Sequence, residues 1–114
     1  MKFKNLKLGD RTLTRIGLAD SCFLRLRGLI GRNVKELGGL WLTPCNQIHM
    51  FFMSSPIDAV YVDRNNTVVK VDAAVPTGVA CPAVKGARAV LELPEGSAAI
   101  FGIVTGTALE LQTI

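Results

Sequence analysis

The apolar residues of this chain fall into short runs separated by turn-forming residues, and this pattern limits the folds open to it. The clearest example is residues 63–66, Asp-Arg-Asn-Asn, which lie between two runs rich in valine. Asp and Asn side chains hydrogen-bond to the backbone in turns, and Asn tolerates the left-handed backbone region. The pattern therefore predicts a β-hairpin over residues 57–75.

Alternation of side-chain type predicts several more strands. Ala89, Leu91 and Leu93 occupy alternate positions of one segment. Glu92 should then lie on the face opposite the leucines, solvated or at the rim. Residues 9–10, Gly-Asp, predict a turn between two further strands. The expected strands are 3–8, 12–18, 40–42, 47–53, 57–63, 67–75, 87–93 and 107–113.

A change of hydrophobic period at residue 20 predicts one helix. Cys22, Leu26 and Leu29 recur at helical spacing and form part of one broad apolar face. Residues 97–101 are expected to form a single helical turn. Many short strands with one short helix near residues 20–30 predict a mainly β fold, a compact antiparallel β-sandwich or barrel. The length of the chain and its lack of repeats predict a single domain over residues 1–114.

Positive charge is concentrated in the first third of the chain. The net charge is +4, yet residues 1–38 hold nine Lys and Arg against three Asp and Glu. Such a region could bind an anionic partner such as nucleic acid or membrane headgroups. We favour a solvated basic face, because no exposed aromatic residues are interleaved with the cations. The cations concerned are Lys2, Lys4, Lys7, Arg11, Arg15 and Arg25.

Cysteine spacing and the terminal sequence argue against several classes of protein. Cys22, Cys45 and Cys81 are odd in number and include no Cys-x-x-Cys pair. Neither a disulfide framework nor a metal site is therefore predicted, and no cofactor is expected. The basic N-terminus is not followed by an apolar stretch, and the uncharged run 37–57 contains prolines and polar residues. We therefore expect no signal peptide, no membrane span and a cytoplasmic location.

The segment 45–63 contains the only histidine together with a thiol and two carboxylates. Cys45, His49 and Asp58 suggest a nucleophile, a base and an orienting carboxylate. Extended backbone would separate Cys45 from His49 by about 13 Å, at roughly 3.3 Å per residue, which is beyond hydrogen-bond reach. The spacing therefore argues against a thiol–imidazole pair.

A hairpin that turns through residues 54–56 would separate His49 from Asp58 as well. In that register His49 faces Tyr61 and Phe52 faces Asp58, so the histidine and the carboxylate emerge on different sides of the sheet. Asp58 is then expected to accept backbone amide hydrogen bonds that close the turn.

Several short motifs occur in the order typical of one protein family. They are residues 27–32 (Arg-Gly-Leu-Ile-Gly-Arg), 49–53 (His-Met-Phe-Phe-Met), 56–58 (Pro-Ile-Asp), 68–69 (Val-Val), 90–96 (Val-Leu-Glu-Leu-Pro-Glu-Gly) and 102–103 (Gly-Ile). Over residues 10–111 the chain resembles the prokaryotic family known as domain of unknown function 192. The resemblance implies a compact β-rich fold and supplies no established activity, cofactor or catalytic residue. Among the matching positions, Arg27 could pair with a carboxylate or bind an anionic ligand.

These observations lead to three hypotheses of function. The one we favour is a non-catalytic binding or assembly domain, whose sheet surface around His49 accepts a protein segment or a small molecule. Its candidate binding residues are Arg27, His49, Phe51, Phe52 and Tyr61. The second is a small hydrolase or transferase, with candidates His49, Asp58, Glu92 and Cys45. The third is nucleic-acid binding through the basic first third of the chain.

Overall fold

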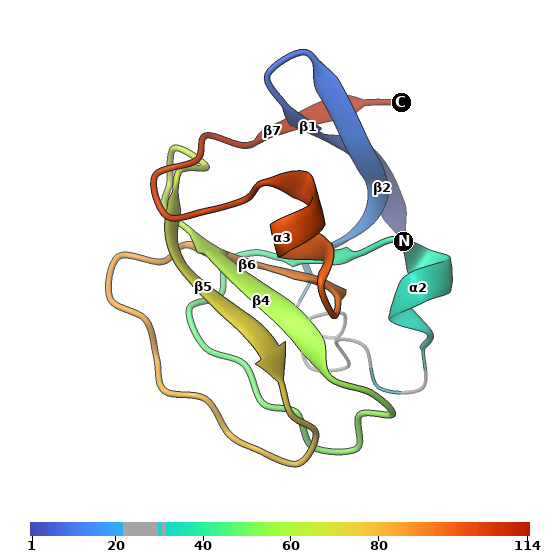
Figure 1. Ribbon diagram of the computed structural model, residues 1–114, viewed down its shortest axis with the longest axis vertical. Coiled ribbons are helices and arrows are strands. Elements are labelled where there is room, and N and C mark those ends of the chain that lie inside the picture. The colour runs from blue at the N-terminus through green and yellow to red at the C-terminus, as the bar shows by residue number, and fades with distance from the viewer. Residues whose placement is uncertain (22–29, 31) are drawn as a thin grey trace.

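The computed structural model describes residues 1–21, 30 and 32–114, and its strands form one seven-stranded sheet (Figure 1). The strands are β1 (Lys2–Leu8), β2 (Arg11–Ala19), β3 (Leu40–Leu42), β4 (Ile57–Val62), β5 (Val68–Val75), β6 (Ala89–Pro94) and β7 (Glu110–Thr113). Their order across the sheet is β5-β4-β6-β3-β2-β1-β7. Neighbouring strands are antiparallel, apart from the parallel pair β2 and β3. The expectation of a mainly β fold is confirmed.

The two outer strands of the sheet are joined just before β7 begins. Thr67 pairs with Ala108 in an isolated antiparallel bridge. The Val68 amide donates to the Thr107 carbonyl at 2.8 Å, and the Gly106 amide donates to the Val68 carbonyl at 2.8 Å. The sheet therefore curls back on itself and approaches a closed barrel, which leaves less backbone unpaired at its edges.

The hairpin predicted over residues 57–75 is present as β4 and β5. The Asp63 carboxylate accepts hydrogen bonds from the amides of Asn65, at 2.8 Å, and Thr67, at 3.1 Å. Asn66 takes the left-handed conformation that the turn requires, with φ 61°. The hairpin of β1 and β2 and the helical turn α3 (Ser97–Phe101) also lie where the sequence predicts them.

Apolar residues cover both faces of this sheet. One cluster lies inside the curve and is covered by α3; it includes Leu6, Leu18, Trp41, Val60, Leu91, Leu93, Ala98 and Leu109. The second lies on the opposite face of β3, β4 and β6; it includes Leu40, Leu42, Ile48, Met50, Ala59, Tyr61, Cys81 and Val90. All six residues of β4 are buried as a result.

The second cluster is covered by two irregular segments and a short helix. Residues 46–50 and 78–84, called the paired loops here, run antiparallel to each other and are held by four backbone hydrogen bonds of 2.7–3.1 Å. Helix α2 (Val34–Leu37) contributes the buried Val34. In Figure 1 the loops lie below the sheet and α2 lies beside it.

Two elements of the structure differ from the sequence prediction. The expected strand 47–53, with its hairpin to 57–63, is wrong, because β4 is already paired with β5 on one edge and with β6 on the other. Helix α2 was not predicted, although Asn33 caps it by accepting from the amides of Lys35 and Glu36. Most of the expected helix over residues 20–30 lies outside the described residues.

Candidate functional site

An exposed group of aromatic rings, called the aromatic tip here, ends the first of the paired loops. It consists of His49, Phe51 and Phe52. Phe51 is 44% exposed and Phe52 is 86% exposed. Phe52 also has a φ of 63°, in the left-handed region that a bulky side chain rarely adopts. The chain therefore holds a large apolar ring in solvent at a cost in backbone strain.

A hydrogen bond to a backbone amide holds the His49 ring within this tip. Its Nδ1 accepts from the amide of Phe51 at 3.2 Å. The His49 ring stacks on the Phe51 ring, with 5.1 Å between centroids and 25° between planes. An isolated bridge joins His49 to Ala80 in the other paired loop. His49 therefore lies on a loop that packs against the sheet and is paired with Ala80. The predicted register, in which His49 faces Tyr61 across a hairpin, is wrong.

A cavity of about 540 Å³, called the tip cavity here, opens beside Phe52. Its lining residues are Arg32, Asn33, Lys35, Phe52, Ser54 and Ser55. The cavity is thus lined by two cations, three neutral polar side chains and the exposed Phe52 ring. None of the described lining residues is acidic. The chemistry of the cavity suits an anionic group attached to an apolar one.

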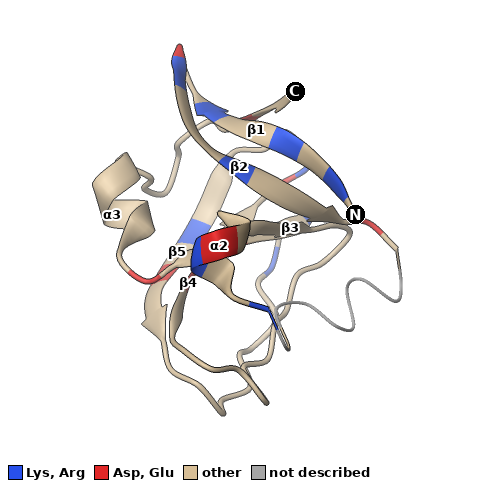
Figure 2. Ribbon diagram, turned by 90° about the vertical axis from the view of Figure 1, so that its right-hand side faces the viewer, with Lys and Arg blue, Asp and Glu red and all other residues tan. Residues whose placement is uncertain are grey.

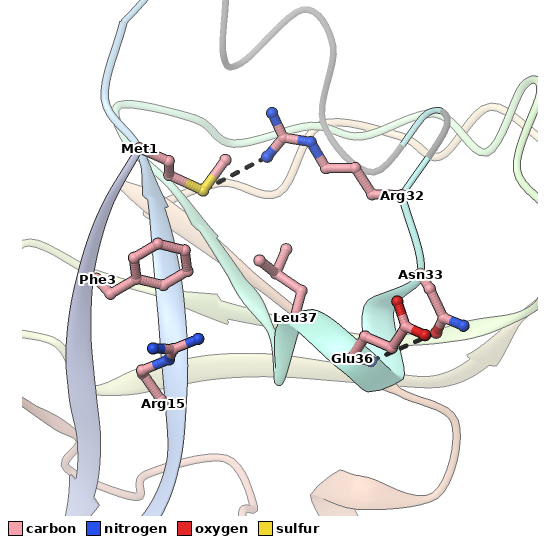
Figure 3. A pocket seen from close by; sticks show the side chains of 7 residues that line it. All are labelled: Met1, Phe3, Arg15, Arg32, Asn33, Glu36 and Leu37. Carbon is pink, nitrogen blue, oxygen red and sulfur yellow. Dashed lines mark hydrogen bonds between the residues drawn. The ribbon is translucent and has the colours of Figure 1, made fainter.

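A second cavity, of about 560 Å³, lies between the β1–β2 hairpin and α2 and is called the α2 cavity here (Figure 3). Its lining residues are Met1, Phe3, Arg15, Arg32, Asn33, Glu36 and Leu37. Arg32 and Asn33 line both cavities, so the two adjoin each other. The α2 cavity combines two guanidinium groups with an apolar surface.

Asp58 is a buried structural acceptor. It is 1% exposed, and its two oxygens accept from the amides of Ala74 and Ala98, each at 2.9 Å. Acceptance of backbone amides agrees with the sequence prediction, but these amides belong to β5 and α3, not to the turn before β4. Asp58 alternates with Ile57 and Ala59, whose side chains reach the layer of the paired loops. It therefore lies on the face of the sheet opposite His49.

Glu92 is buried, which contradicts the expectation of a solvated or rim carboxylate. It is 4% exposed, and its Oε1 atom has no hydrogen-bond partner among the described residues. It does lie opposite Leu91 and Leu93, as predicted, and therefore faces the layer of the paired loops. Burial raises the pKa of the Glu92 carboxyl to about 8, so this group is largely neutral near pH 7.

Tyr61 shares that buried face with Glu92. It is fully buried, and its hydroxyl also lacks a hydrogen-bond partner in the part of the chain that the structure describes. Burial raises its pKa well above the ordinary value, with smaller contributions from the charges of neighbouring groups such as Cys81 and Asp72. Tyr61 is therefore part of the second apolar cluster and is not exposed at the aromatic tip.

In the part of the chain that the structure describes, no hydrogen bond joins His49 to Asp58 or Glu92. The Cys45 thiol donates to the Gln47 carbonyl at 3.1 Å, and His49 Nδ1 is occupied by a backbone amide. Burial raises the pKa of the Cys81 thiol, and the nearby Asp72 carboxylate raises it further, which disfavours a thiolate there. Within the described residues, no group of three His, Cys, Asp or Glu has the geometry of a metal site.

The basic residues of the first third are spread along both strands of the β1–β2 hairpin (Figure 2). Arg15 lies over the Phe3 ring, 4.4 Å from its centroid, and Arg11 donates to the Phe101 carbonyl at 3.2 Å. These two cations therefore have contacts within the chain. Arg25 and the candidate binding residue Arg27 lie outside the described residues. In the described part of the chain, no helix is long and apolar enough to cross a membrane.

Several lining residues were not singled out from the sequence. The pair Asn33 and Glu36 has the spacing of a helix cap, a signal that could have located α2 and one wall of each cavity. Pairing of the β1–β2 hairpin about Gly9 could have placed Arg15 diagonally across from Phe3. No sequence signal indicates that Arg32 lies between the cavities.

This chain is similar to proteins known from sequence and from solved structures. A UPF0127 protein from Thermococcus sibiricus is 32% identical over 87 residues, which are 72% of this chain and 56% of the relative. The chain thus spans little more than half of that relative's length. A protein of unknown function from Novosphingobium aromaticivorans has a similar structure, with a TM-score of 0.75 and 24% identity over 95% of this chain and 82% of its own.

A second solved structure has a similar fold. A candidate transcription regulator from Sinorhizobium meliloti also has a TM-score of 0.75, with 20% identity over 96% of this chain and 94% of its own. At this level of identity both structures show a shared fold. The family DUF192, described as "Uncharacterized ACR, COG1430", matches residues 5–111. Because that match spans nearly the whole chain, this protein belongs to the DUF192 family.

Proposed function

We propose that this protein is a non-catalytic binding domain that docks an acidic segment of a partner protein on the aromatic tip and in the tip cavity. One observation carries the proposal: Phe52 is 86% exposed while its backbone is held at a φ of 63°. A strained, solvent-exposed aromatic residue has no role in the core, and backbone strain of this kind is concentrated at functional sites. Exposed aromatic rings are also typical anchors of protein interfaces.

Charge supports an acidic partner. Arg32 and Lys35 line the tip cavity beside Phe52, and none of the described lining residues is acidic. Ser54, Ser55 and Asn33 add hydrogen-bonding groups that a peptide backbone can use. An apolar side chain against Phe52, followed by an Asp or Glu side chain on the cations, matches this arrangement.

A peptide fits these features better than a lipid surface does. A flat membrane surface favours several apolar side chains at one level above a ring of cations. At the aromatic tip the exposed apolar side chains among the described residues are Phe51 and Phe52, and the cations line a concave space of about 540 Å³. The concave shape and the polar groups inside it favour a segment that inserts a side chain.

Titration with synthetic acidic peptides, each carrying one leucine or aromatic anchor, tests the proposal. Binding is measured by calorimetry and by shifts of the backbone amide signals of residues 49–55. The Phe52→Asn variant should weaken binding at least tenfold, because it removes the anchor and keeps a residue that tolerates the left-handed backbone. Lys35→Glu should weaken binding similarly by reversing the charge.

Ile100→Asn is the matched control, since Ile100 is 80% exposed on α3 and lies outside both cavities. Its binding should equal that of the unchanged protein. The proposal is rejected if no acidic peptide binds, or if Ile100→Asn loses as much affinity as Phe52→Asn. Binding to anionic lipid vesicles that depends on Phe52, with no peptide binding, would assign the tip to membranes instead.

A further inference from the structure

We propose that the α2 cavity is a separate binding site for a small monocarboxylate with an apolar body. The cavity is about 560 Å³, within the size range of small-molecule sites. It lies between the β1–β2 hairpin and α2, and its lining does not include His49, Phe51 or Phe52. The site therefore goes beyond the docking of a partner segment at the aromatic tip.

Arg15 is positioned to hold the carboxylate. Its guanidinium lies 4.4 Å from the centroid of the Phe3 ring, which fixes the plane of the group through a cation–π contact. The N–H groups at the edge of a guanidinium stacked in this way remain available, and they match the two oxygens of a carboxylate. Arg15 and Glu36 line the same cavity, yet no ion pair joins these two described residues.

The cavity also offers an apolar surface for the apolar part of the ligand. Figure 3 shows the Phe3 ring and the Leu37 side chain between the guanidinium groups of Arg15 and Arg32. Met1 adds a thioether, whose sulfur accepts from Arg32 Nη1 at 3.4 Å. A thioether is polarisable and adapts its shape to an apolar ligand.

The charge of the described lining favours a carboxylate over a neutral molecule. Arg15 and Arg32 are cationic, and Glu36 is the one acidic side chain among the described lining residues. A carboxylate is attracted by this excess of cationic side chains, whereas a neutral molecule of the same shape is not.

Titration with three monocarboxylates of different shape tests the site: phenylpropionate, indole acetate and octanoate. Each is compared with its neutral primary amide, and binding is followed through the backbone amide signals of residues 3, 15 and 37. We expect at least one carboxylate to bind saturably and its amide to bind at least tenfold more weakly. Arg15→Gln should remove this preference for the carboxylate.

Arg64→Gln is the matched control, because it removes one positive charge from an exposed turn outside both cavities. It should leave carboxylate binding unchanged, and so should Phe52→Asn, which disables only the tip. The inference is overturned if none of the three carboxylates binds at millimolar concentration. Equal binding of acid and amide, or equal losses in Arg15→Gln and Arg64→Gln, would overturn it too.

Discussion

The contribution of the buried Glu92 carboxyl to the free energy of unfolding should become increasingly unfavourable as pH rises from the acid side to neutrality. Glu92 lies between Leu40 on β3 and Ala59 on β4, and it is 4% exposed. Burial raises its pKa from the ordinary 4.5 to about 8. Because burial disfavours the charged form, the folded protein holds this proton far more tightly than the unfolded chain does.

The sign and size of the effect follow from these two pKa values. Below about pH 4.5 Glu92 is protonated in both states, so it does not lower the free energy of unfolding. Between about 4.5 and 8 only the unfolded chain ionises, which costs the folded state about 1.4 kcal/mol per pH unit. The loss reaches about 3 kcal/mol at pH 7 and on the order of 5 kcal/mol above pH 8, where it levels off.

The Glu92→Gln variant removes this titration and keeps the size of the side chain. We expect the variant and the unchanged protein to differ little near pH 4, and the variant to be more stable by about 3 kcal/mol at pH 7. Urea denaturation followed by the fluorescence of Trp41 measures both across this range. Glu95→Gln, at an exposed position, should show no growing difference. A Glu92→Gln difference that stays constant from pH 4 to pH 8 would refute the reasoning.

Three further substitutions have outcomes that urea denaturation can measure. Asp58→Asn should cost about 2 kcal/mol, because an Asn side chain has one acceptor oxygen and one of the two backbone amides therefore loses its acceptor; a cost within the surface range of about 0.5 kcal/mol would contradict this. Phe52→Asn should raise the free energy of unfolding by about 1 kcal/mol as strain at φ 63° is relieved, and a loss of stability would argue against that strain. Gly38→Ala should cost at least about 2 kcal/mol more than Gly78→Ala, since both have positive φ but only at Gly38 does a Cβ overlap a carbonyl oxygen, that of Arg15. Equal costs at the two glycines would contradict the overlap.

Local patterns in the sequence predicted the elements whose formation depends on neighbouring residues. The turn at 63–66 and its two flanking strands are one case, and the turn around Gly9 is another. The alternation around Leu91 also predicted correctly that Glu92 faces away from the leucines. It could not predict burial, because the segments that cover Glu92 come from distant parts of the chain and are irregular.

The failed prediction for residues 47–53 has a different cause. Apolar residues in this segment resemble a strand, but strand formation needs a free edge on a neighbouring strand. Both edges of β4 are taken, one by its local partner β5 and the other by β6, some thirty residues further along the chain. Competition from a distant strand does not show in a local pattern, so neither the loop conformation of His49 nor the tip could be predicted.

That competition also explains how the chain supports a strained residue at the tip. With no edge of β4 available, residues 46–50 take backbone partners from residues 78–84. Ile48 and Met50 then pack into the second apolar cluster, which fixes the position where the loop turns away. Packing and hydrogen bonds on the buried side can offset the strain of about 1–3 kcal/mol that a left-handed Phe52 introduces. Substitutions at Ile48 or Met50 should therefore disturb the tip without touching a ligand, whereas Phe52→Asn should alter the tip surface alone. Amide hydrogen exchange of residues 50–53 distinguishes the two, since it should accelerate only when the support is weakened.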